Sequence, residues 1–204
     1  MKLPHAWFLP ETYDILGTLI EQLDIVEQSF SILAAWCAGA DGADPIIAMR
    51  ALIVQEHVRR RRLHTQVRSS FSTPLGAEDL FELGERLGEI CERSYAVVRE
   101  AELSHTATDP CLGLQVDAIE RALVPLGAAI HALPHARAGK LADESLELLT
   151  AAEHAYRTAI ADLESETDLR RELRRRELYR RAEHLTDAVR GAARRTWYAV
   201  YKSQ

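Results

Sequence analysis

The sequence lacks the features that mark several large classes of protein. Its three cysteines, Cys37, Cys91 and Cys111, are an odd number without a CxxC pair, which argues against a disulfide framework and favours reduced thiols that pack as small apolar side chains. No run approaches the ~18 consecutive apolar residues that a membrane span needs. Residues 1–10 are too short and too polar for a signal peptide. We therefore expect a cytoplasmic protein without a membrane span.

Catalytic motifs are missing as well. The chain has no GxGxxG, Walker loop, GxSxG or HExxH sequence, and no cysteine stands beside a histidine. The ferritin-like di-iron pattern needs two ExxH pairs, whereas the sequence offers Glu102-x-x-His105 near a helix end. A formal net charge of −6 argues against nucleic acid as a partner. These absences favour a protein that is not an enzyme.

Helical periodicity is what the chain has in abundance. Apolar residues recur at steps of three and four, and no segment alternates with period two. Asp44-Pro45 and Asp109-Pro110 are helix start signals, with Asp as N-cap and Pro at the first helical position. Helices are predicted over residues 10–38, 45–70, 77–101, 110–133, 141–164 and 168–202. The predicted fold class is all-α.

The order of the helices also repeats. The spacing of Ile53, His57, Leu63 and Val67 returns in Leu149, Glu153, Ala159 and Leu163. Long helices with heptad-like apolar stripes and short connections are typical of antiparallel bundles. We therefore predict two tandem antiparallel three-helix bundles, residues 1–106 and 107–204, that form one compact unit.

Polar residues interrupt the apolar stripe of the second predicted helix. His57 and His64 fall within the stripe of Ile53, and Glu56 lies on its edge. A polar group among core positions must find a hydrogen-bond partner, a counter-charge or a metal. In the next helix Gly84 and Gly88, four residues apart, leave a smooth strip that a neighbouring backbone can approach closely.

The dipeptide Glu-His recurs in the middle of three predicted helices, at Glu56, Glu153 and Glu183. Asp187 follows Glu183 by one turn, which places two carboxylates on the same face. Like charges at that spacing need a metal or an arginine beside them. Oxygen and imidazole ligands suit Fe, Mn, Ni or Zn. The other interpretation is a solvated face on which Arg180 or Arg190 neutralises the acids.

Two runs of arginine can also be interpreted in two ways. Residues 59–62 and 170–181 are rich in arginine, and Glu172 and Glu177 interrupt the second run. Helical twist spreads such a run around all faces, so a salt-bridged, solvated surface is the simpler interpretation. The alternative is a site for an anionic partner such as phosphate, acidic lipid or a transporter loop.

Three stretches of the sequence carry a family resemblance. They are Phe8-Leu9-Pro10, the segment from Phe71-Ser72-Thr73-Pro74-Leu75 to Glu78-Asp79-Leu80, and Glu183-x-x-x-Asp187. The resemblance is to the PhoU-like accessory proteins of Pit-type inorganic phosphate transporters. It implies two three-helix bundles, a cytoplasmic regulatory partner of a phosphate transporter, and metal held by Glu/Asp-x-x-x-Asp motifs.

The metal-ligand positions that the resemblance implies fall on four pairs of residues. They are Ile53 and His57, Gly88 and Glu89, Leu149 and Glu153, and Glu183 and Asp187. The candidate metal ligands are therefore Glu56, His57, Glu89, Glu153, Glu183 and Asp187, for a divalent or trivalent metal such as Fe, Zn, Mn or Ni. No catalytic residue is predicted.

The leading hypothesis is a non-enzymatic regulator that docks on a phosphate transporter or its signalling partner, at the inner face of the plasma membrane. A homodimer is a further expectation. The first alternative is a metal-binding or metal-dependent enzymatic bundle that uses Glu153, Glu183 and Asp187. The second is a purely structural, oligomerising bundle whose polar core residues set the helix register.

Overall fold

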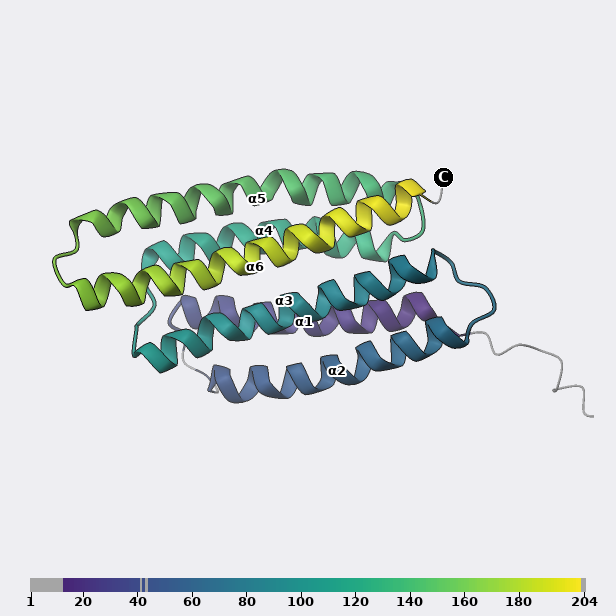
Figure 1. The fold of residues 1–204 in the computed structure, drawn as a ribbon, viewed down its shortest axis with the longest axis horizontal. Coiled ribbons are helices and arrows are strands. Elements are labelled where there is room, and N and C mark those ends of the chain that lie inside the picture. The colour runs from purple at the N-terminus through teal and green to yellow at the C-terminus, as the bar shows by residue number, and fades with distance from the viewer. Residues whose placement is uncertain (1–12, 41, 43, 203–204) are drawn as a thin grey trace, which may run out of the picture.

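Six α-helices and one 3₁₀ turn account for nearly all of the residues that the computed structural model describes, which are 13–40, 42 and 44–202 (Figure 1). The helices are α1 (Ile15–Cys37), α2 (Pro45–Ser69), α3 (Ala77–Ser104), α4 (Pro110–His131), α5 (Arg137–Asp162) and α6 (Leu169–Lys202). Leu163–Ser165 form the 3₁₀ turn after α5. Every regular element in these residues is helical, so the predicted all-α fold class is confirmed.

Aspartate side chains cap the first turns of four helices. Asp44 accepts a bond from the Ile46 amide at 2.9 Å and Asp109 accepts one from the Leu112 amide at 2.9 Å, which confirms both Asp-Pro start signals. Asp168 accepts the amide of Arg170 at the start of α6. The start predicted for the first helix was too early, because Asp14 caps α1 through the Gly17 amide at 2.8 Å. Residues 8–11 lie outside the described part of the chain.

The fifth helix also differs from the prediction at both ends. It begins at Arg137 instead of residue 141, because turn bonds from the Ala138 amide to His135 and from the Gly139 amide to Ala136 form its first turn. Ala138 is fully buried, so this first turn already belongs to the core. At the other end α5 stops at Asp162, and the chain tightens into the 3₁₀ turn.

The helices pack as two groups of three. α1, α2 and α3 contact one another, as do α4, α5 and α6, and the chain passes from the first group to the second through residues 105–109 (Figure 1). Leucine, isoleucine and valine fill the interior of both groups, with Leu19, Leu33, Leu87, Ile119 and Leu185 all fully buried. Burial of this apolar surface is the main stabilising contribution to the fold.

Two helix pairs join the groups. α3 runs along α6, and α1 packs against α4 (Figure 1). Asp79, near the start of α3 and almost fully buried, pairs with Arg195 at 2.8 Å and with Lys202 at 3.6 Å near the end of α6. Because the two partners of Asp79 come from the last turns of the chain, α6 fastens the C-terminal group to the N-terminal one.

The face that α2 turns inward differs from the prediction by one residue. Glu56 is fully buried, whereas the His57 side chain is 42% exposed and Ile53 is only partly buried. The buried row runs through Met49, Leu52, Glu56 and Leu63. Met49 and Leu63 are buried as predicted. The prediction that His57 lies in the core and Glu56 on its edge was wrong, because in the middle of α2 packing turns Leu52 and Glu56 inward instead.

The cysteines are free thiols, as the odd number and spacing suggest. Cys91 is buried, and Cys37 and Cys111 are partly buried. Burial raises the pKa of the Cys37 thiol to about 12 and that of Cys91 to about 11, so both stay protonated and unreactive at neutral pH.

Candidate functional site

A buried carboxylate lies at the centre of the first group of helices. Glu56 on α2 accepts a hydrogen bond from the Gln22 side-chain amide of α1 at 2.8 Å. The same Gln22 nitrogen donates to the Gly84 carbonyl of α3 at 2.6 Å. Gln22 therefore connects all three helices around Glu56. The second carboxylate oxygen of Glu56 is buried and has no hydrogen-bond partner.

The two glycines of α3 make room for this arrangement. A Cβ atom on Gly88 would lie 2.6 Å from Glu56 Oε1 and 2.6 Å from Arg60 Nη1, and one on Gly84 would lie 2.6 Å from a methyl group of Leu63. The smooth strip predicted from the sequence does allow a close approach. The groups that approach it are side chains of α1 and α2, whereas the prediction named a neighbouring backbone.

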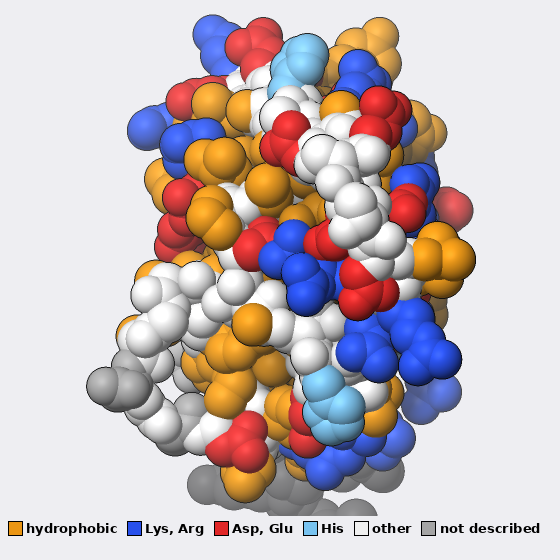
Figure 2. Space-filling model, turned by 90° about the vertical axis from the view of Figure 1, so that its left-hand side faces the viewer, with side chains coloured by type: hydrophobic (Ala, Val, Ile, Leu, Met, Phe, Trp, Pro, Cys, Tyr) orange, Lys and Arg blue, Asp and Glu red, His pale blue; other side chains and the backbone are white. Residues whose placement is uncertain are grey.

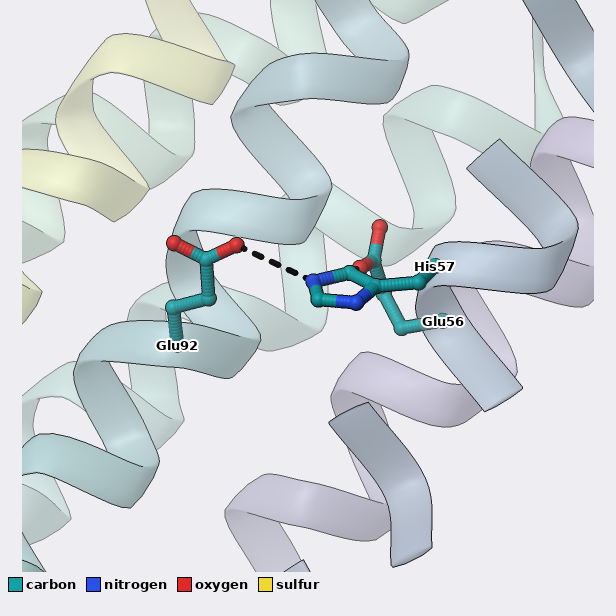
Figure 3. A group of neighbouring side chains, drawn as sticks. All are labelled: Glu56, His57 and Glu92. Carbon is teal, nitrogen blue, oxygen red and sulfur yellow. Dashed lines mark hydrogen bonds and ion pairs between the residues drawn. The ribbon is translucent and has the colours of Figure 1, made fainter. Parts of the chain in front are cut away.

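Glu56, His57 and Glu92 come together at the boundary between core and solvent (Figure 3). His57 Nε2 lies 3.5 Å from Glu92 Oε1 of α3 and 3.8 Å from Glu56 Oε2. One ligand atom from each residue falls within 4.8 Å of the others. Sequence reasoning missed Glu92 and named Glu89 in its place. The signal that identifies it is the spacing of four that extends the row of Gly84 and Gly88 to Glu92.

Arg60 supplies positive charge to the same cluster. Its guanidinium group contacts Glu56 at 3.4 Å, Glu85 at 3.2 Å and Glu92 at 3.4 Å. His64, stacked on Phe81, lies 3.5 Å from Glu85. Three carboxylates thus face one guanidinium group and two imidazoles. Burial raises the pKa of Glu56 above its usual value, and Arg60 and the Gln22 hydrogen bond oppose that shift without cancelling it.

The carboxylates predicted in the second group of helices lie around an arginine. Arg190 of α6 pairs with Glu153 of α5 and with Asp187 at 2.5 Å. Arg157 adds a contact to Glu153 at 3.5 Å. Burial raises the pKa of Glu183, the negative charge of Asp187 raises it further, and Arg190 opposes both effects. Of the two arginines predicted to neutralise these acids, Arg190 does so, and Arg180 pairs with Glu177 instead.

Glu89 forms no ion pair with either cluster, although it lines the same surface hollow as Arg60 and Glu92. It pairs on α3 with Arg86 at 3.1 Å and with Arg93 at 3.4 Å. The structure therefore groups the predicted ligands into Glu56 with His57, and Glu153 with Glu183 and Asp187, and leaves Glu89 in a separate ion-pair network.

Two comparisons with known proteins give no relative at the level of sequence: no family model matches, and no curated protein matches. The comparison with solved structures does find similar proteins. A crystal structure of a PhoU-like protein from Shewanella oneidensis MR-1 matches with a TM-score of 0.77 at 14% identity, over 93% of this chain and 100% of that one. This chain has the PhoU-like fold. A proposed PhoU-like phosphate regulatory protein from the same organism matches with a TM-score of 0.66, at the same identity and coverage.

The PhoU-like fold predicted from the sequence is therefore confirmed over nearly the whole chain. In the described residues, no helix is both long enough and apolar enough to cross a membrane. That finding agrees with the sequence, in which charged residues interrupt every helical segment.

The resemblance to PhoU-like proteins implies a metal, and the donors of this chain test that implication. Among the described residues, Glu56, His57 and Glu92 form the one group of three ligand atoms close enough to share an ion. The unpartnered oxygen of buried Glu56 and the imidazole of His57 fit Zn, Mn or Fe. Both sites have an arginine beside their acids, Arg60 at Glu56 and Glu92 and Arg190 at Glu153 and Asp187. Glu153, Glu183 and Asp187 fit less well, because in the described residues they do not form a group of three ligand atoms close enough to share an ion.

Proposed function

We propose that this chain is a non-enzymatic regulator of phosphate transport that acts at the cytoplasmic face of the membrane by docking on a transporter or on its signalling partner. The observation that carries the proposal is the match in fold to PhoU-like proteins over their full length. The match covers 93% of this chain and therefore extends over both groups of helices.

The outer face of α2 is the surface that we assign to docking. Ile47, Val54 and Val58 are 68%, 64% and 55% exposed, and their spacing of seven and four puts them on one side of the helix. Single exposed apolar side chains are ordinary, whereas a row of them along one helix is typical of a surface that contacts another protein. A partner helix laid along this row would bury it.

The test of docking uses membranes from the host organism. Purified chain is mixed with membranes that contain the phosphate transporter and with membranes from a strain that lacks it, and the fraction that sediments is measured. We expect binding to the first and not to the second. Equal sedimentation with both membranes would overturn the proposed partner.

A metal-linked form of the regulator is the finer part of the proposal, with Glu56, His57 and Glu92 as ligands. An ion there would meet the unpartnered oxygen of Glu56 and tie α2 to α3. We expect about one equivalent of metal per chain, measured by elemental analysis of protein purified without chelator. Glu56→Gln/Glu92→Gln should lose it.

The matched control for the metal is Glu183→Gln/Asp187→Asn in the second group, which should keep the metal because Arg190 neutralises that site. Loss of metal from the control and not from the Glu56 variant would place the ion at Glu153, Glu183 and Asp187 instead. Metal-free wild-type protein would contradict the metal-linked form while leaving the docking proposal in place.

A further inference from the structure

A pocket rich in arginine lies at the end of the molecule where the two groups of helices are joined. It has a volume of about 460 Å³ and lies between residues 105–107, which follow α3, and the first two turns of α6. Its walls carry His105, Thr106, Arg170, Arg171, Arg174 and Arg175. Figure 2 looks onto this end of the molecule and shows Lys and Arg side chains gathered beside acidic ones.

The four arginines differ in whether a carboxylate neutralises them. Arg171 lies 3.6 Å from Glu166, and Arg175 lies 3.6 Å from Asp109 and 4.0 Å from Glu166. In the described part of the chain, no carboxylate lies within ion-pair distance of the exposed guanidinium groups of Arg170 and Arg174. Two cationic groups of the pocket are therefore left without a counter-charge.

Asp168, the one acidic residue that lines the pocket, does not neutralise these two arginines. Asp168 uses its carboxylate as the cap of α6, accepting the backbone amides of Arg170 at 2.9 Å and Arg171 at 3.3 Å. The N-terminal amides of α6 are satisfied in this way, so the positive character of the pocket comes from the guanidinium groups. The lining holds four guanidinium groups against one carboxylate.

The later part of the arginine run, residues 176–181, differs from the pocket. Arg176 pairs with Glu172 at 2.9 Å, Arg180 pairs with Glu177 at 2.7 Å, and Arg181 also reaches Glu177. The salt-bridged surface predicted for this run is thus found beyond the pocket and at Arg171 and Arg175 within it, but not at Arg170 and Arg174. In a chain whose net charge is −6, the two unneutralised arginines of this pocket make it a candidate site for an anion.

We propose that this pocket binds an anion that carries two or more phosphate groups. Arg170 and Arg174 are four residues apart on one helix face and have no carboxylate beside them among the described residues, so their charges repel until an anion lies between them. The planar guanidinium fork matches phosphate oxygens in pairs of hydrogen bonds. A pocket of about 460 Å³ exceeds what one phosphate ion needs and falls in the range of small-molecule sites.

Binding of such an anion goes beyond the proposed function and does not depend on it. The binding test uses purified protein alone, whereas docking and transport are tested on membranes and in cells. The two tests can therefore fail separately. The chain can regulate transport without binding phosphate compounds, or bind them without regulating transport, and the experiments distinguish these cases.

The probe is tripolyphosphate, titrated into the full chain by calorimetry in low salt, with inorganic phosphate in parallel. We expect saturable binding of tripolyphosphate that Arg170→Gln/Arg174→Gln weakens on the order of tenfold or more. Both residues are exposed, so the variant should fold, which circular dichroism verifies. The matched control is Arg121→Gln/Arg194→Gln, which removes two exposed arginines elsewhere and should leave binding unchanged.

A second arm distinguishes a free phosphate compound from a lipid headgroup. Vesicles that contain cardiolipin, whose headgroup carries two phosphates, are compared with phosphatidylcholine vesicles in a sedimentation assay with the same variants. Binding to the anionic vesicles that the Arg170 variant loses, without binding of tripolyphosphate, supports the pocket with a headgroup as its ligand. The proposal is overturned if neither probe binds, or if the control variant weakens binding as much as the pocket variant does.

Discussion

Glu56 is the residue at which the first group of helices departs most from an ordinary apolar core. It is fully buried, half of its carboxylate lacks a hydrogen-bond partner, and burial raises its pKa. The sequence identified Glu56 as a polar residue near the core. It could not show the burial, because what accommodates this carboxylate is Gln22 from another helix and the missing side chain of Gly88.

The raised pKa of Glu56 gives a prediction about stability. The Glu56 carboxyl binds its proton more tightly in the folded protein than in the unfolded chain, where its pKa is near 4.5. The contribution of Glu56 to stability therefore falls as the pH rises above 4.5 and through the pKa of the folded state. The variant Glu56→Gln has no carboxyl group at this position, so it does not lose stability in this way as the pH rises. The difference in melting temperature between Glu56→Gln and wild type should therefore shift in favour of the variant between pH 4.5 and pH 8.

Thermal melts at both pH values check this, with Glu89→Gln as the control for lost surface charge, because Glu89 lies outside the cluster. A difference between Glu56→Gln and wild type that stays the same at both pH values would show that Glu56 does not titrate differently in the folded state.

At the scale of the element, the sequence predicted where helices start but not which face of a helix points into the core. Asp-Pro pairs fix where α2 and α4 begin, because capping and the proline preference are local effects. The inward face of α2 depends on its neighbours. Leu52 with Glu56 and Ile53 with His57 fit a stripe equally well in sequence, and the choice between them lies in the packing against α1 and α3.

The same helix carries the prediction about docking. Val54→Glu/Val58→Glu should abolish sedimentation with membranes that contain the transporter, because the change places two charges in the apolar row of α2. Both side chains are exposed, so the melting temperature should change little. The control is Leu114→Glu/Val124→Glu on α4, where side chains of similar exposure leave docking intact. If both variants dock as wild type does, the α2 row is not the docking surface.

At the scale of the whole molecule, periodicity predicted an all-α bundle and the family resemblance predicted the PhoU-like fold, and the match in structure confirms both. The distribution of charge on its surface could not be predicted from the sequence. The arginine pocket joins residues 105–107 to residues 168–175, and the ion pairs of Asp79 join α3 to the end of α6. Contacts so distant in sequence depend on how the two groups of helices pack, which periodicity does not encode.

The measurement that tests the central claim most directly is uptake of radiolabelled phosphate by host cells that lack this gene. Cells complemented with the wild-type gene serve for comparison, and sulfate uptake serves as the control for a general effect. A regulator of phosphate transport predicts that deletion changes the rate of phosphate uptake, that complementation restores it, and that sulfate uptake stays the same. Unchanged phosphate uptake at both low and high external phosphate would contradict the proposed function.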